Sequence, residues 1–176
     1  MKHSKIHENQ TRIIFILYLV LLVWVVLFKL NTNLLAIDHM RSVNLIPFHY
    51  EDGSNLFFHR KEVIANILVF IPLGVYTCIF RPQWSVLQRV VPALGLSILF
   101  ESVQFLFAMG ATDITDIITN TLGALLGILL FAILKRIWEK NCIAIINGIG
   151  LCIEIMALAL ILLLTLANGA AGSINM

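Results

Sequence analysis

Long apolar stretches separated by short polar segments decide what this chain can fold into. About 20 apolar residues cross the hydrocarbon core of a bilayer as a helix, which satisfies its backbone hydrogen bonds internally. The composition agrees, because 60% of the residues are hydrophobic and only 12% are charged, unlike a soluble domain. We expect one all-α, polytopic helical membrane bundle over residues 1–176. Its five transmembrane spans are expected at about residues 13–29, 63–80, 86–109, 116–134 and 143–167.

The distribution of Lys and Arg orients these spans, since cytoplasmic segments carry more of them. With the N-terminus inside, the inner segments hold eight basic residues and the outer segments hold four. The outer four, Lys29, Arg41, Arg60 and Lys61, lie in or beside the first outer loop, residues 30–62. We therefore expect an N-in, C-out protein that crosses the plasma membrane several times.

Polar side chains interrupt the apolar stretches mainly in the outer half of this topology. At about 1.5 Å per helical residue, Asn66, Gln104 and Glu101 lie roughly 7, 8 and 12 Å from the outer ends of their spans. Asp116 and Asn120 begin the fourth span. A carboxylate at membrane depth is costly unless it is paired, hydrated or protonated. The candidate ligand-binding residues are therefore Asn44, Asn66, Glu101, Gln104, Asp113, Asp116 and Asn120.

Helical spacing predicts that these side chains share faces. Glu101 and Gln104 are three residues apart, and Asp116 lies three residues after Asp113 and four before Asn120.

A helix start gives a second interpretation of the acidic pair. Gly110 would form the turn, Thr112 would be the helix N-cap, and Asp113 and Asp116 would favour the positive end of the helix dipole. Glu101 lies deeper and near no helix start, so capping does not explain it.

Three carboxylates close together require compensation in a low dielectric. Candidate cations are Arg41, Arg60 and Lys61 from the outer loop. A bound divalent metal ion held by Asp113 and Asp116, or a ligand head group, is an alternative, although no resident cofactor is expected. A polar clasp that only joins helices would account for the cluster equally.

Other features carry less chemistry. Gly123 and Gly127 form a G-x-x-x-G pattern that favours close helix packing and permits a homo-oligomer. Glu154 lies alone in the fifth span, where it would reach Asn147, be protonated or meet a partner helix. The chain has no nucleotide-binding or catalytic signature, and its scattered cations do not indicate nucleic-acid binding.

The motifs NLIPF (44–48), NILVFIPLG (66–74) and SILFESVQFLFAMGATDITDIITNTLGALLG (97–127), with YLVLLVWVVLFKL (18–30), resemble the VanZ family of Gram-positive bacteria. The resemblance covers the first three quarters of the chain, in the family's order. It implies a bacterial membrane protein linked to resistance against teicoplanin and related lipid-bearing glycopeptides. The family's polar motif residues correspond here to Asn44, Asn66, Pro72, Gly74, Glu101, Gln104, Asp113, Asp116, Asn120 and Gly123.

Three functions fit these residues. The first is a membrane protein whose outer polar pocket binds an envelope component, such as a lipid-linked cell-wall precursor, or the antibiotic itself. Carboxylates and amides suit a sugar or an amine better than a bare phosphate. The second is an enzyme acting on an envelope lipid or glycan, with Glu101 as catalytic base and Asp113 and Asp116 as metal ligands. The third, a transporter or ion pathway, is disfavoured because the polar groups other than Glu154 occupy one half of the membrane and no inverted repeat is evident.

Overall fold

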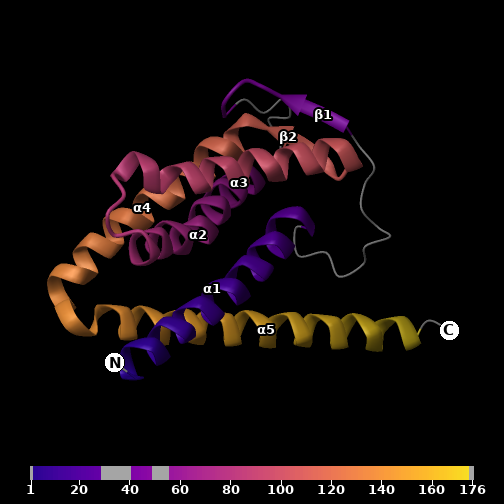
Figure 1. Cartoon of the computed structure of the whole chain (residues 1–176). Coiled ribbons are helices and arrows are strands. Elements are labelled where there is room, and N and C mark those ends of the chain that lie inside the picture. Colours follow the sequence, from indigo (N-terminus) through magenta and orange to yellow (C-terminus); the bar gives the residue numbers. More distant parts are fainter. Residues whose placement is uncertain (1, 29–40, 49–55, 175–176) are drawn as a thin grey trace. The chain divides into compact units, whose positions relative to one another are not determined.

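The computed structural model describes residues 2–28, 41–48 and 56–174, and these are largely helical (Figure 1). Much of the expected outer loop, residues 30–40 and 49–55, lies outside the described residues. The elements are α1 (Lys2–Phe28), β1 (Arg41–Asn44), α2 (Leu56–Phe80), α3 (Val86–Phe107), β2 (Gly110–Asp113), α4 (Ile114–Trp138), the 3-10 helix η2 (Glu139–Asn141) and α5 (Cys142–Ile174). The expected all-α membrane bundle is confirmed, with a short pair of strands added.

The described residues contain four stretches long and apolar enough to cross a membrane, where five were expected. The first three, Glu8–Leu27, His59–Phe80 and Val86–Phe107, agree closely with the expected spans. The fourth, Ile114–Leu163, covers 50 residues and includes both remaining expected spans. It contains α4, η2 and most of α5, and its α-helical path is interrupted at Glu139, where φ is 36°. Four stretches are found instead of five because Glu139–Asn141, between the last two expected spans, is itself helical and joins them into one stretch.

The chain divides into two compact units, which are described separately. Unit 1 comprises residues 1–22 and 141–176, and unit 2 comprises residues 23–140. In unit 1 the amide nitrogen of Asn147 donates to the Thr11 hydroxyl over 2.8 Å, and both side chains are buried. Asn147 is thus paired with α1 rather than with Glu154, which is buried further along α5.

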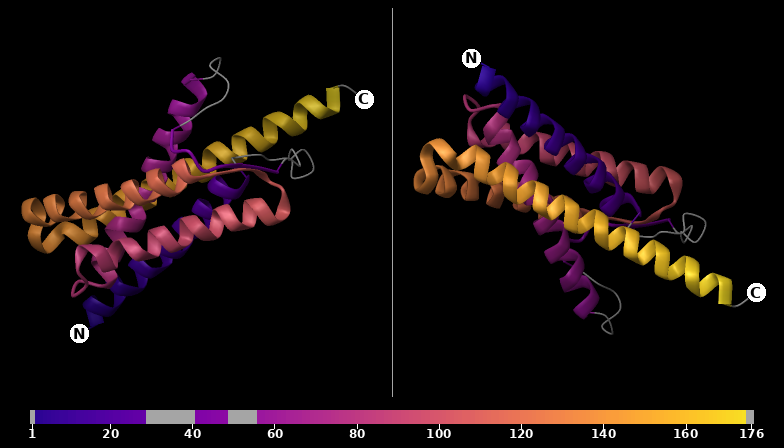
Figure 2. Two further views of the ribbon diagram at one scale, coloured as in Figure 1. Left: turned by 90° about the horizontal axis from the view of Figure 1, so that it is seen from above. Right: turned by 90° about the horizontal axis from the view of Figure 1, so that it is seen from below.

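Unit 2 is built on a close crossing of α2 and α4 (Figures 1 and 2). Gly123 lies against the backbone oxygen of Ile67, and Gly127 lies against that of Ile71. In return, Gly74 lies against the backbone oxygen of Ala124. A Cβ atom at any of these three glycines would collide with that backbone oxygen. The expected packing role of the G-x-x-x-G pattern is therefore confirmed, and its partner is α2 of the same chain.

The two ends of α3 are fixed by local hydrogen bonds. At its start the Ser85 hydroxyl accepts from the Gln88 backbone N–H, while the Gln88 side chain accepts from the Ser85 backbone N–H. This reciprocal pair satisfies donors that a helix start leaves unpaired. At its end Ala108 adopts a left-handed conformation, with φ 54°, and turns the chain toward β2.

The glycines make the α2–α4 crossing testable. Gly127→Ala should destabilise the protein by about 1–3 kcal/mol, because the added methyl group meets backbone that has no flexible side chain to move. The measurement is thermal unfolding of the purified protein in detergent. Gly95→Ala in α3 is the matched control, since open space surrounds that position. Equal stability of the two variants would contradict the close crossing.

Candidate functional site

A two-stranded parallel sheet joins the segment between α1 and α2 to the connection between α3 and α4. Arg41 pairs with Gly110, and the register ends with Asn44 opposite Asp113. The side-chain amide of Asn44 donates to Oδ2 of Asp113 over 3.2 Å. The sheet thus brings together two candidate residues that are 69 positions apart in sequence. Gly110 was expected to form a turn, but it begins β2 instead.

Asp113 caps the N-terminus of α4. Its Oδ1 accepts from the Thr115 backbone N–H over 2.7 Å, with Asp113 in an extended conformation. The capping interpretation of Asp113 is confirmed, whereas the expected N-cap, Thr112, precedes the cap by one residue. A carboxylate suits this position because it meets both an unpaired donor and the positive end of the helix dipole.

Glu101 holds the same helix start from the side. Its Oε2 accepts from the Asp113 backbone N–H over 3.0 Å, and its own carbonyl accepts from the Thr112 hydroxyl over 3.4 Å. The residue is only 4% exposed. A buried carboxylate is stabilised by backbone donors aimed at it. Glu101 does not cap a helix itself. It holds the capping residue Asp113 in place by accepting a hydrogen bond from the Asp113 backbone N–H.

Asp116 meets the third polar candidate. The amide nitrogen of Asn66, in α2, donates to Oδ1 of Asp116 over 2.7 Å. Both side chains are partly exposed. The acid–amide pairs Asn44–Asp113 and Asn66–Asp116 thus attach β1 and α2, respectively, to the beginning of α4.

The segment after β1 is folded back onto the start of α4. The Asn44 side-chain oxygen accepts from the Ile46 backbone N–H over 3.1 Å, which forms a local turn. The Phe48 backbone N–H donates to the Thr115 hydroxyl over 3.1 Å. The predicted break in helical structure at Pro47 agrees with this non-helical segment. Hydrogen bonds of its backbone to Asn44 and Thr115 hold it at the candidate site.

Gln104 and Asn120 are directed elsewhere. Gln104 donates to the Val26 carbonyl in the last turn of α1 over 3.1 Å. Asn120 forms a hydrogen bond of 2.9 Å with the Ser97 hydroxyl of α3. They are 2% and 1% exposed, and in the described part of the chain their side-chain oxygens have no hydrogen-bond partner. The structure thus directs Gln104 to α1 and Asn120 to Ser97 of α3, away from the acid–amide pairs at the start of α4.

Ser97 and Thr115 were missed by the sequence reasoning. Ser97 precedes Glu101 by four residues and Gln104 by seven, so helical spacing places it on the same face of α3. That spacing could have identified Ser97 from the sequence. No sequence pattern identifies Thr115, because its partner is the backbone N–H of Phe48, which is distant in sequence.

The predicted cation and metal ligands remain predictions. Arg60 and Lys61 have exposed side chains near the start of α2, and the side chain of Arg41 lies outside the described residues. Within the described ranges, no group of three or more His, Cys, Asp or Glu residues is placed to hold a metal ion. Asp113 and Asp116 instead accept hydrogen bonds from protein amides.

Comparison with known proteins places the chain in a family. The VanZ/LLP1 family model matches residues 15–139. The chain is also 39% identical to Protein VanZ of Enterococcus faecium over 145 residues, which cover 81% of this chain and 86% of that protein. The chain belongs to the VanZ family. The family match contains all seven candidate ligand-binding residues and ends within η2. No solved structure matches the chain.

The Glu101 contact predicts a graded effect of substitution in this VanZ-family protein. Glu101→Ala should destabilise it by about 1–3 kcal/mol, because a partly buried backbone N–H loses its acceptor. Glu101→Gln should cost less, since its amide oxygen can accept the same hydrogen bond. Thermal unfolding of the purified variants in detergent measures both. Equal losses in the two variants would show that the backbone contact does not account for the role of Glu101.

Proposed function

We propose that this VanZ-family protein confers resistance to teicoplanin and related lipid-bearing glycopeptides. In this proposal a polar site at the outer end of unit 2 binds a component of the bacterial cell envelope and so limits access of the drug to the surface. The site consists of Asn44, Asn66, Glu101, Asp113 and Asp116. The observation that carries the proposal is their convergence on the start of α4 from β1, α2 and α3.

The orientation of unit 2 supports an outward-facing site. The glycine contacts give α2 and α4 the same direction, because residues 67 and 71 meet residues 123 and 127 in order. The start of α4 carries the acidic site, and its last turn carries Lys135 and Arg136. Since basic ends favour the cytoplasm, the acidic end belongs at the outer surface of the plasma membrane.

Partial burial at the site suits a ligand. Asn44, Asn66, Asp113 and Asp116 are partly exposed, whereas Glu101 is buried behind them. Groups that are both ordered by protein contacts and reachable from outside are pre-organised, which reduces the cost of binding.

The chemistry of the site favours a hydrogen-bond donor as its ligand. Asn44 and Asn66 direct their amide nitrogens at Asp113 and Asp116, since ionised carboxylates only accept hydrogen bonds. Each carboxylate offers about four acceptor positions and no donor. The site is therefore rich in acceptors and suits the hydroxyl groups of a sugar or an amine. Both groups occur in lipid-linked cell-wall precursors and in glycopeptide drugs.

Binding is favoured over catalysis by the structural duties of the carboxylates. Glu101, the candidate catalytic base, accepts from a backbone N–H, and Asp113 caps a helix. A general base has to reach and exchange a substrate proton, and protonation of Glu101 would weaken the contact that orders the site.

Resistance assays test the proposal. Asp116→Asn in a teicoplanin-susceptible host should abolish most of the resistance, because it removes the charge while leaving an amide that can still pair with Asn66. Ser102→Ala is the matched control, since its exposed hydroxyl bonds to the Ile98 carbonyl of the same helix. The assay compares drug susceptibility at equal protein abundance. Full resistance of the Asp116→Asn variant would overturn the proposal.

A second measurement separates binding from catalysis. Cells with the protein should bind less fluorescent teicoplanin, while mass spectrometry of their envelope lipids and wall fragments shows no new species. A modified lipid or glycan that disappears with Glu101→Gln would instead establish the enzyme alternative.

A further inference from the structure

Five cationic side chains gather at one end of unit 2. This end is opposite to the polar site at the start of α4. Arg81 and Arg89 belong to the connection between α2 and α3 and to the first turns of α3, and Lys135, Arg136 and Lys140 belong to the end of α4 and to η2. In sequence, the segments 81–89 and 135–140 contain one carboxylate, Glu139, which leaves a net charge of +4. We call these five residues the basic end.

The two segments of the basic end lie at the same end of unit 2. Cys78, in the last turn of α2, is within the electrostatic influence of both Arg89 and Lys135. The Arg89 guanidinium donates to the Pro82 carbonyl over 2.7 Å and to the Cys78 sulfur over 3.6 Å. Arg89 therefore ties the start of α3 to the end of α2 and holds one cation of the basic end in place.

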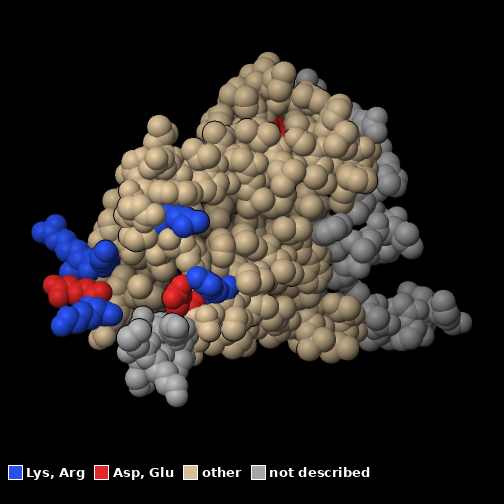
Figure 3. Space-filling view, in the orientation of Figure 1, with Lys and Arg blue, Asp and Glu red and all other residues tan. Residues whose placement is uncertain are grey.

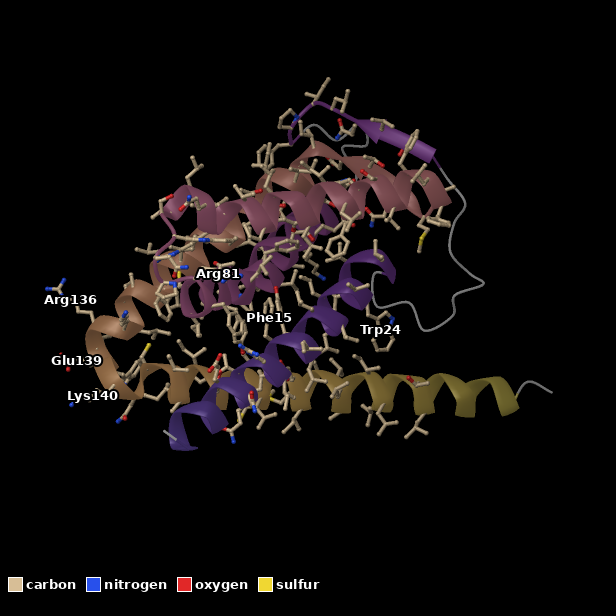
Figure 4. The ribbon with its side chains drawn as sticks, in the orientation of Figure 1. Phe15, Trp24, Arg81, Arg136, Glu139 and Lys140 are labelled. Atoms are coloured by element: carbon tan, nitrogen blue, oxygen red, sulfur yellow. The ribbon has the colours of Figure 1, made fainter. Side chains whose placement is uncertain are left out.

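The remaining cations are directed outward. Arg81, Arg136 and Lys140 have exposed side chains, and Figure 4 shows Arg136 and Lys140 projecting from the end of α4. In Figure 3 the Lys and Arg side chains in view gather at this end, with Asp and Glu side chains among them, on a surface that is otherwise largely uncharged. Arg81, Arg136 and Lys140 are thus available to a molecule outside unit 2.

Apolar and aromatic groups border the basic end. Leu87 and Ile137 are 77% and 61% exposed, as expected for residues that face lipid chains. The Arg81 guanidinium lies 5.5 Å from the centre of the Trp84 ring, and Trp138 is also exposed. Tryptophan is enriched at the level of lipid head groups. The basic end therefore lies at the depth of the head groups, with apolar surface directly beside it.

From this arrangement we infer that the basic end binds the head groups of anionic phospholipids. The cations contact the phosphate and the net negative head group, while the exposed apolar residues contact the acyl chains of the same molecule. A soluble phosphate would contact the cations but not the exposed apolar residues. The arrangement therefore favours a lipid as the ligand of this surface. Basic sites between helices at the cytoplasmic face are a recurrent form of lipid recognition.

Lipid titration of the full-length protein tests this inference. Native mass spectrometry in detergent should show retention of phosphatidylglycerol in preference to phosphatidylcholine. Arg136→Gln with Lys140→Gln should weaken phosphatidylglycerol binding roughly thirtyfold, given the contribution of each cation near an anionic head group. Arg60→Gln with Lys61→Gln removes the same charge from the start of α2 and should leave that binding unchanged.

Two further arms keep the test decisive. High salt should abolish the lipid preference of the unsubstituted protein, because exposed charges are screened; this arm does not depend on whether a variant folds. Glycerol phosphate at the same concentration should not displace the lipid. Equal retention of the two lipids, equal loss in the two variants, or displacement by glycerol phosphate would each overturn the inference.

Discussion

The hydrogen bond from the Asp113 backbone N–H to the Glu101 carboxylate is the contact on which the rest of the site depends. It fixes the residue at which β2 ends and α4 begins. Asp113 can then use its side chain for two tasks, accepting from Thr115 within α4 and from Asn44 on β1. A buried carboxylate that accepts a backbone donor is costly to replace, because its removal leaves the donor unpaired in a low dielectric.

The sequence allowed the helices and the polar end to be predicted, because both follow from local pattern. Apolar length located the spans, and helical spacing grouped Glu101 with Gln104 and Asp113 with Asp116. The sheet between 41–44 and 110–113 could not be predicted, because neither four-residue segment has a strand pattern of its own. Its formation depends on a chain reversal that the α3–α4 connection supplies.

The polar pairings within the site were predicted only in part for the same reason. Periodicity tells which side chains share a face of one helix, but it does not tell which residue on another element each one meets. Asn120 was expected to share a helix face with Asp116, but that spacing did not show that it meets Ser97 of α3. Asn66 was expected to join the cluster, but only the register of α2 against α4 shows that it meets Asp116.

The glycines of α2 and α4 connect these observations. Because Gly74, Gly123 and Gly127 allow backbone-to-backbone contact, one turn of α2 is matched to one turn of α4 along the crossing. That match sets which residues of the two helices meet. It brings Asn66 to Asp116 at the start of α4. A shift of one helical turn, about 5.4 Å, would break that hydrogen bond, so the packing of small residues in the middle determines which polar groups meet at the end of unit 2.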